Sequence, residues 1–496
     1  MDADPKPLDH LPSCGAPDAA ALLGPDGRLT FSGLEHETGS LAKWLLTGSF
    51  PAGARVASWL PKSRLAALLP LAAVRAGLVH VPINPALRRA QVAHIVADSG
   101  ASLLIANAGR IASLEPGDAD GLAVDEAGLD YTGLTPLPPS HGDPAALAAL
   151  LYTSGSTGRP KGVMLSSANL WLGAEAVARF LRLAPGDRTL AVLPLSFDYG
   201  QNQLFAAWAA GGAALPLDYL SPRDVVREIE THRITTLAGV PPLWVQLSEA
   251  KWTEASRLGL RRITNSGGAM PRPLFERLRA LFPHAEIHLM YGLTEAFRST
   301  TLPPELADTH PWSIGRAIPH AEVLVVRADG SVADEGEPGE LVHAGPLVAG
   351  GYWKDPERTA ARFRPAPPAS RYGGTAVWSG DTAVREAGGL LRFVGRDDEM
   401  IKTSGNRVSP GEIEDAALAC AGVVEAAAFG VPDARLGQAI HLVVRGEEGA
   451  RVRLLAQLKR ELPAWMQPAS IRWRDVLPRS PNGKLDRARL KAELLA

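Results

Sequence analysis

YTSGSTGRPKG, residues 152–162, holds three glycines, four Ser or Thr hydroxyls and two cations. Glycine lets the main chain approach a ligand closely, and successive backbone N–H groups in such a loop form a concavity that binds anions. The hydroxyls add further donors, and the ammonium of Lys161 adds a positive charge. This stretch therefore predicts an anion-binding loop around which the chain is organised.

Two other interpretations apply to the same stretch. A P-loop requires G-x-x-x-x-G-K-[ST]. Here Pro160 stands in place of the second Gly and Gly162 in place of the Ser or Thr, so a P-loop is excluded. A flexible surface turn is the other interpretation, because Ser, Thr, Gly and Pro are common in turns. The stretch alone leaves that second alternative open.

Residues 153–162 match the pattern [ST]-S-G-[ST]-T-G-x-P-K-G throughout. They resemble the phosphate-binding loop of the AMP-forming adenylating enzymes, a superfamily that includes acyl-CoA synthetases, nonribosomal peptide adenylation domains and luciferases. Further matches extend the resemblance from about residue 25 to the C-terminus. It implies that the chain uses ATP and Mg²⁺. In this loop the implied nucleotide-binding residues are Thr153, Ser154, Gly155, Ser156, Thr157, Gly158 and Lys161.

Composition narrows the possible functions. The chain has 496 residues, so its length predicts roughly three domains, or one large domain with a smaller unit attached. A formal net charge of −2 gives no electrostatic reason to expect nucleic acid or an anionic membrane surface as a partner. Cys14 and Cys420 are too isolated for a disulfide framework. Because the N-terminus is acidic and no apolar run is long enough to span a bilayer, we expect a cytoplasmic protein.

Apolar strands alternate with helices over most of the chain, which predicts an α/β fold with a largely parallel sheet. Ser32 and Ser221 are expected to cap two of the helices. From about residue 320, short alternating strands predict a small β subdomain, and the last hundred residues predict a separate α+β unit. We therefore expect an adenylation core over residues 1–397 and a small, mobile C-terminal domain over residues 398–496.

Tyr291-Gly292-Leu293-Thr294-Glu295 follows an apolar strand, at the sheet edge where open α/β sheets bind ligands. An aromatic ring can stack on adenine, and a carboxylate can hold Mg²⁺. By resemblance to the superfamily's Y-G-x-T-E, Tyr291 stacks on adenine, Thr294 contacts a phosphate and Glu295 is the metal ligand. A plain strand-end turn is the alternative. Residues 265–269, NSGGA, resemble the segment against the adenine and the acyl pocket, through Gly267 and Gly268.

Three further segments resemble the superfamily's motifs. Residues 378–381, WSGD, match its [ST]-G-D and make Asp381 the ribose ligand, although a turn-forming Asp is equally consistent. Residues 395–408 match its hinge, G-R-x-[DK]-x-x-I-K-x-x-G-x-R-[VI]; a charged linker is the alternative. Near the C-terminus, NGKLDR matches N-G-K-[VIL]-x-R. The implied roles are nucleotide contact for Arg396, hinge for Asp398, thiol transfer for Gly405 and Arg407, and catalysis for Lys484.

Residues 196–200, SFDYG, bear on the substrate. Adenylation domains for amino acids read F-D-x-S here, with the Asp pairing the substrate ammonium, whereas acyl-CoA synthetases commonly have an aromatic residue or His. An ionised Asp in a pocket needs a partner, so Phe197 and Asp198 favour an amino acid or another amine-bearing acid. Asp198 could instead bind local backbone N–H groups or Tyr199.

A second resemblance favours other acids. Residues 291–300, YGLTEAFRST, are similar to AMP-forming acyl-CoA ligases that accompany exosortase systems, so an amine-free fatty or aryl acid stays open. The family's acceptor is a phosphopantetheine thiol, on CoA or on a carrier protein, and no carrier segment follows Ala496. We therefore expect the acceptor to act in trans. A non-catalytic nucleotide-binding protein is the alternative of another class.

Overall fold

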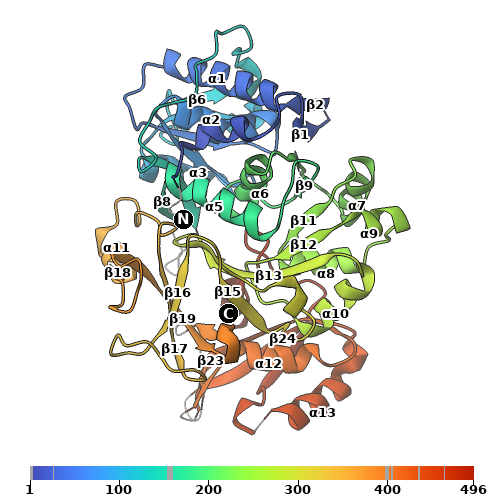
Figure 1. Cartoon of the computed structure of the whole chain (residues 1–496). Coiled ribbons are helices and arrows are strands. Elements are labelled where there is room, and N and C mark those ends of the chain that lie inside the picture. The colour runs from blue at the N-terminus through green and yellow to red at the C-terminus, as the bar shows by residue number, and fades with distance from the viewer. Residues whose placement is uncertain are drawn as a thin grey trace.

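The computed structural model describes residues 4–25, 27–153, 160–396, 401–403, 406–433, 436–462 and 464–495. Strands of this part of the chain form three sheets with helices packed on them (Figure 1). In Figure 1 the blue N-terminal elements lie at one end of the molecule, and the orange and red C-terminal elements lie at the other. No helix within these ranges is long and apolar enough to cross a membrane.

The first sheet carries at its edge the two strands that flank the predicted phosphate-binding loop. Its strand order is β6 (Ala123–Asp125), β5 (Ala101–Ala106), β3 (Arg55–Trp59), β4 (Val79–Pro82), β7 (Leu147–Thr153) and β8 (Lys161–Ser166). The pairs are parallel except β7–β8, which is antiparallel and sets Thr153 opposite Lys161. The loop thus joins two strands, not a strand and a helix as in a P-loop. The helices of this part of the chain are α1 (Phe31–Thr47), α2 (Arg64–Arg75), α3 (Arg89–Ser99) and α4 (Ala108–Ile111).

The second sheet supplies the edge on which the other motifs meet. Its parallel strands run in the order β1 (Ala20–Gly24), β10 (Ala213–Pro216), β9 (Arg188–Ala191), β11 (Thr236–Gly239), β12 (Arg262–Asn265) and β13 (Glu286–Leu293). Gly239 and Asn265, the last residues of β11 and β12, lie side by side in the register with Leu289, where the parallel pairing of β13 ends. The loops that follow these strands therefore share one edge. The helices of this part are α5 (Ser167–Phe180), α6 (Asp198–Ala209), α7 (Pro222–Thr231), α8 (Pro241–Ser248), α9 (Glu254–Gly259) and α10 (Arg272–Leu281).

Helix α6 is buried between the two sheets. Phe205 and Trp208 pack in the core of the first sheet, while Phe197 and Tyr199 pack in the core of the second. A helix that is buried all round is normally apolar all round. This one carries three consecutive buried amides, at Gln201, Asn202 and Gln203, which points to a function for its polar side chains.

The predicted β subdomain is continuous with the second sheet. β13 pairs with β14 (Phe297–Thr301), and the path continues through β15 (Ser313–Ala317), β20 (Leu391–Arg396), β19 (Thr375–Arg385), β17 (Pro338–Ala344) and β16 (Glu322–Val326). These neighbours are antiparallel. The strand β2 (Gly27–Thr30) closes the other edge, β18 (Phe363–Pro365) pairs with β19, and α11 (Pro356–Arg362) precedes it. The predicted β subdomain is therefore an antiparallel extension of the second sheet, and the antiparallel pairing already begins at β14, before residue 320.

The C-terminal residues form their own sheet and core. β24 (Gly437–Gly446) pairs with β23 (Val423–Asp433), β21 (Ile401–Thr403) and β25 (Ser470–Trp473), and β22 (Asn406–Val408) pairs with β21. The helices are α12 (Pro410–Leu418), α13 (Arg451–Glu461) and α14 (Arg487–Leu495). Ile413, Leu442 and Leu454 are fully buried in this core. The expected boundary at 397/398 lies outside the described residues, so the division at that point stays a prediction.

Candidate active site

A lysine, a glutamate and a tyrosine form a buried network beside the phosphate-binding loop. The ammonium of Lys161 lies 3.2 Å from Glu295 Oε1 and donates to the Tyr352 hydroxyl at 2.7 Å. The Tyr352 hydroxyl donates to the same Glu295 oxygen at 2.6 Å. Burial alone raises the pKa of Glu295, but the Lys161 charge and the hydrogen bonds from Tyr352 and Lys161 bring this pKa below its usual value. Glu295 is therefore held as a carboxylate.

Tyr352 belongs to a segment that the sequence motifs did not single out. Gly350 donates to the Met164 carbonyl, and Gly351 accepts from the Met164 N–H, both at 2.9 Å, so the segment runs along β8. The sequence signal that could have identified this segment is the pair Gly350-Gly351 directly before the aromatic Tyr352. On the other side of the network, Thr153 has its hydroxyl buried without a hydrogen-bond partner among the described residues. An unpaired donor next to a cation suits a phosphate oxygen.

The residues expected to hold the nucleoside lie together on the second sheet. The Tyr291 hydroxyl donates a short hydrogen bond to Asp381 Oδ2. The Tyr291 ring stacks on His343, with ring centroids 5.8 Å apart and an interplanar angle of 19°. Burial lowers the pKa of His343 to about 3, so its imidazole is neutral near pH 7. In the strand register, Arg396 of β20 lies opposite Asp381 of β19.

Lys484 reaches this edge from the C-terminal unit. Its ammonium lies 5.0 Å from the centroid of the Phe197 ring. A Cβ atom placed on Gly267 would lie 2.9 Å from Lys484 Cε, and Gly267 has φ +76°, so a side chain there would meet this lysine in a strained backbone. The turn that carries Lys484 is held by Asn84, whose Nδ2 donates to the Pro481 carbonyl at 2.9 Å and to Asn482 Oδ1 at 3.0 Å.

Asp198 begins helix α6 at the same edge. Thr294 Oγ1 donates to Asp198 Oδ1 at 3.3 Å, which joins two motifs that lie far apart in the sequence. Next to them, Asn265 Nδ2 donates to the Gly268 carbonyl at 3.0 Å and shapes the glycine turn. The structure therefore brings together Lys161, Phe197, Asp198, Gly267, Gly268, Tyr291, Thr294, Glu295, Asp381 and Lys484 on adjoining sheet edges.

Several expected site residues cannot be placed in the same way. Ser154, Gly155, Ser156, Thr157, Gly158, Asp398 and Gly405 lie outside the described residues, and the structure gives the backbone but not the side chains of Arg396 and Arg407. Within the described ranges, no group of three or more His, Cys, Asp or Glu side chains is arranged to hold a metal ion. Mg²⁺ is commonly bound by one or two carboxylates together with substrate phosphates, so Glu295 beside the phosphate loop fits such a site.

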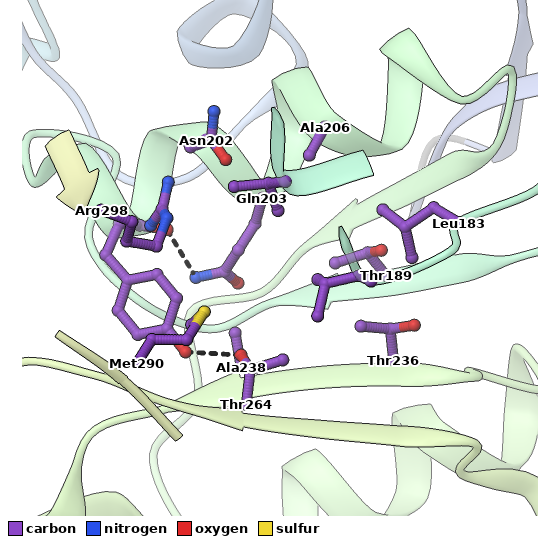
Figure 2. Close-up of a pocket in the computed structure, with 13 residues that line it drawn as sticks. Leu183, Thr189, Asn202, Gln203, Ala206, Thr236, Ala238, Thr264, Met290 and Arg298 are labelled. Atoms are coloured by element: carbon purple, nitrogen blue, oxygen red, sulfur yellow. Dashed lines mark hydrogen bonds between the residues drawn. The ribbon is translucent and has the colours of Figure 1, made fainter. Parts of the chain in front are cut away.

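A narrow pocket opens beside α6, between this helix and strands β9, β11, β12 and β14 (Figure 2). Its cavity volume, measured for a water-sized sphere, is about 20 Å³. Arg298, three residues beyond Glu295, lies in its wall and is 2% exposed. This arginine belongs to the stretch YGLTEAFRST, but none of the sequence motifs gives it a role.

Comparison with known proteins agrees with this geometry. The AMP-binding enzyme family matches residues 14–353, and the AMP-binding enzyme C-terminal domain matches residues 412–484. Sulfoacetate–CoA ligase of Cupriavidus necator is 33% identical over 504 residues, covering 96% of this chain and 94% of that protein. Tyrocidine synthase 3 of Brevibacillus parabrevis is 30% identical over 485 residues, covering 96% of this chain but 7% of that protein. ATP-bound MatB from Rhodopseudomonas palustris superposes with a TM-score of 0.88 at 26% identity, covering 98% of this chain and 99% of that chain.

Proposed function

Since this chain belongs to the AMP-binding enzyme family and is an AMP-forming acid–thiol ligase, we propose that the acid it activates is an amino acid or another amine-bearing acid. The acid becomes an acyl-adenylate with release of pyrophosphate, and the acyl group then passes to a phosphopantetheine thiol of a carrier protein or CoA. The cytoplasm stays the predicted location.

Asp198 is the observation that supports an amine-bearing substrate. It begins α6, the helix whose following residues line the pocket, and it accepts a hydrogen bond from the hydroxyl of Thr294. A carboxylate in such a position gains most from a positive partner. The buried Arg298 guanidinium already attracts Asp198. A substrate ammonium would add a second positive charge, and it would fix the acid with its own carboxylate toward Thr294 and Lys484.

The first step needs charge stabilisation more than proton transfer. A carboxylate oxygen of the acid attacks the α-phosphorus of ATP, and the bond between that phosphorus and the pyrophosphate oxygen breaks. The acid is already ionised near pH 7, so no general base is required. We assign Lys484 and Thr294 to the reacting groups, and Thr153 with Lys161 to the departing phosphates. Glu295 would hold Mg²⁺, which supplies positive charge to those phosphates when bound.

The second step exchanges the adenylate for a thioester. The thiol sulfur attacks the acyl carbon, the bond to the AMP oxygen breaks, and the thiol proton is lost. Lys484 lies beside Phe197 and Gly267 in this structure. We therefore propose that the small C-terminal domain turns about Asp398 before the thiol enters, bringing Gly405 and Arg407 close.

ATP–pyrophosphate exchange without an acceptor tests the substrate proposal. The panel contains α-amino acids, β-amino acids, aryl acids and fatty acids. We expect exchange with an amine-bearing acid, and we expect Asp198→Asn to reduce its kcat/KM at least about 10²-fold, since a charged partner is left unpaired. Asn retains an acceptor for Thr294, and Asp334→Asn, at an exposed site, is the matched control. Exchange with amine-free acids alone would overturn the proposal and leave Asp198 a structural role.

One alternative within the same class is favoured by a relative. The sulfoacetate–CoA ligase is named for an acid without an amine, so a CoA ligase for an amine-free acid is the second candidate. The same panel separates the two. A non-catalytic nucleotide-binding protein is disfavoured by the Lys161–Glu295 pair and by Lys484 at the sheet edge.

A further inference from the structure

Arg298 is a buried cation whose hydrogen-bonding capacity no described residue satisfies. Its side chain is 2% exposed, and its Nε, Nη1 and Nη2 atoms all lack a hydrogen-bond partner within the described part of the chain. Arginine stays protonated in proteins, so this is a buried positive charge. Such a charge is costly unless it is paired, and Asp198 attracts it electrostatically without accepting a hydrogen bond from it among the described residues. The arrangement therefore points to a ligand that supplies the missing acceptors.

The neighbouring backbone and rings hold Arg298 in place. Phe297 has φ +59°, a conformation that is unfavourable for a bulky residue. Its ring packs on Gly173 of α5, where a Cβ atom would approach it to 2.7 Å. The guanidinium lies 4.3 Å from the Phe297 ring centroid and 4.9 Å from that of Tyr199. These rings attract the cation but leave its N–H groups without acceptors.

Other donors also line the pocket, and Figure 2 shows Asn202 and Thr236 set apart from Arg298 around it. Asn202 Nδ2 and Thr236 Oγ1 line the pocket, are buried, and have no hydrogen-bond partner among the described residues, and the same holds for one acceptor, Gln203 Oε1. No acidic side chain lines the pocket in that part of the chain. A pocket that offers several unpaired donors and one positive charge suits an anion.

We propose that this pocket binds a second anionic group of the acid substrate, a carboxylate or a sulfonate, through Arg298. The inference deepens the proposed acid activation and rests on it. Asp198 and Asn202 are four residues apart on α6, which corresponds to a rise of about 6 Å along the helix between the two ends of the proposed binding region. That spacing fits an acid with a few carbon atoms between the two charged groups.

Four acids of similar length test the two charges separately: glutamate, glutamine, glutarate and butyrate. Glutamine keeps the shape of glutamate but lacks the second charge, and glutarate lacks the amine. We expect ATP–pyrophosphate exchange with glutamate at a kcat/KM at least about 10²-fold above that with glutamine, because a pocket built for a charged group rejects an analogue without it. Aspartate and cysteate extend the comparison to a shorter chain and to a sulfonate.

The outcomes of this experiment distinguish the amine proposal from the anion-site proposal. Glutamine used as well as glutamate would overturn the anion site while leaving the amine proposal standing. Glutarate preferred to glutamate would support the anion site and overturn the amine proposal. If no acid supports exchange, the melting temperature decides: a dianionic acid that raises it more than its neutral analogue supports the site, and no difference overturns it.

Arg298→Met keeps an unbranched, flexible side chain as far as about the position of Nε and removes the charged guanidinium. We expect the variant to lose the preference for glutamate over glutamine and, without ligand, to melt at a higher temperature than the wild type, because a buried charge without acceptors is gone. Arg298→Lys should keep part of the preference. The control is Arg272→Met, whose side chain is 74% exposed. An unchanged preference in a folded Arg298→Met variant would contradict the proposal.

Discussion

We propose that the first chemical step depends most on Lys484. In the proposed reaction its ammonium stabilises negative charge as the carboxylate attacks the α-phosphorus. Removing one such electrostatic contact costs roughly 3–4 kcal/mol in the transition state, by analogy with oxyanion donors. We expect Lys484→Ala to lower ATP–pyrophosphate exchange at least about 10²-fold with an unchanged melting temperature.

Lys459→Ala is the matched control, because Lys459 is an exposed lysine on α13 of the same C-terminal unit. Its exchange rate should equal that of the wild type. Near-normal exchange by Lys484→Ala would remove this lysine from the catalytic assignment.

Tyr352 supports the charge state of Glu295. Tyr352→Phe deletes the 2.6 Å hydrogen bond to the carboxylate and the acceptor for Lys161, so we expect a loss of about 1–3 kcal/mol in the free energy of unfolding at pH 7. A carboxylate whose pKa is depressed by folding adds stability above its unfolded pKa and loses it as pH falls. The difference between wild type and variant should therefore shrink as pH drops below about 4.3, the ordinary glutamate pKa.

Chemical denaturation from pH 7 to about pH 3.5 measures this difference on both sides of that pKa. The substitution Tyr372→Phe, at an exposed tyrosine, serves as the control. A stability difference that stays constant across the range would mean that Tyr352 does not act through the ionisation of Glu295.

Short motifs surround Glu295, Asp198 and Lys484, so sequence patterns can single out each of them as a candidate. The sequence motifs did not identify Tyr352 or Arg298, for a physical reason. Tyr352 meets Glu295 across 57 residues of chain, and only the folded sheet brings them together. The significance of Arg298 lies in its burial without hydrogen-bond acceptors among the described residues, which no local pattern reveals.

At the scale of the element, the start of α1 differs from the prediction. The helix begins at Phe31, and its cap is Thr30, whose Oγ1 accepts from the Gly33 N–H at 3.1 Å, whereas Ser32 lies in the first turn. We expect Thr30→Ala to lower the free energy of unfolding by about 1 kcal/mol. Ser32→Ala is the matched control and should have a much smaller effect in urea denaturation. An equal loss in both variants would contradict this assignment.

The cap of another helix agrees with the prediction from the sequence. Ser221 caps α7, with Asp224 completing a capping box, as the pattern Ser-Pro-Arg-Asp indicates. The cap of α1 was misplaced because two hydroxyls stand two residues apart, and local propensity cannot choose between them. Packing decides which hydroxyl caps the helix. Because Phe31 is buried in the core, the helix begins at Phe31 and its cap is the residue before it.

At the scale of the whole molecule, docking of the C-terminal unit controls whether Lys484 reaches the site. Asn84→Asp keeps the acceptor for the Ala86 N–H but loses both bonds that Nδ2 donates to the lysine turn. We expect pyrophosphate exchange to fall roughly tenfold, a change of about 1.4 kcal/mol, while thiol transfer from a preformed acyl-adenylate is unchanged.

Glu249→Gln weakens a second contact with the C-terminal unit, a 3.5 Å pair with Arg445 at a partly exposed site, and serves as the comparison. Exposed ion pairs contribute about 0–1 kcal/mol, so its effect should be small. Equal losses of both half-reactions in Asn84→Asp would show that Asn84 acts on general stability and not on docking.

The fold class and the C-terminal α+β unit were predictable, because strand and helix patterns are local. The continuity of the β subdomain with the second sheet was not, since it depends on pairing between strands that are distant in sequence, such as β15 and β20. The placement of Lys484 beside Gly267 was likewise beyond sequence patterns, because it depends on how two distant parts of the chain pack together.

Isotope transfer tests the central claim most directly. The acid that supports exchange is labelled with ¹⁸O in its carboxylate and incubated with ATP and the thiol acceptor. Because a carboxylate oxygen bonds to the α-phosphorus and stays there when the thioester forms, AMP recovered by mass spectrometry should carry one ¹⁸O atom. Unlabelled AMP, or label in pyrophosphate, would contradict the account.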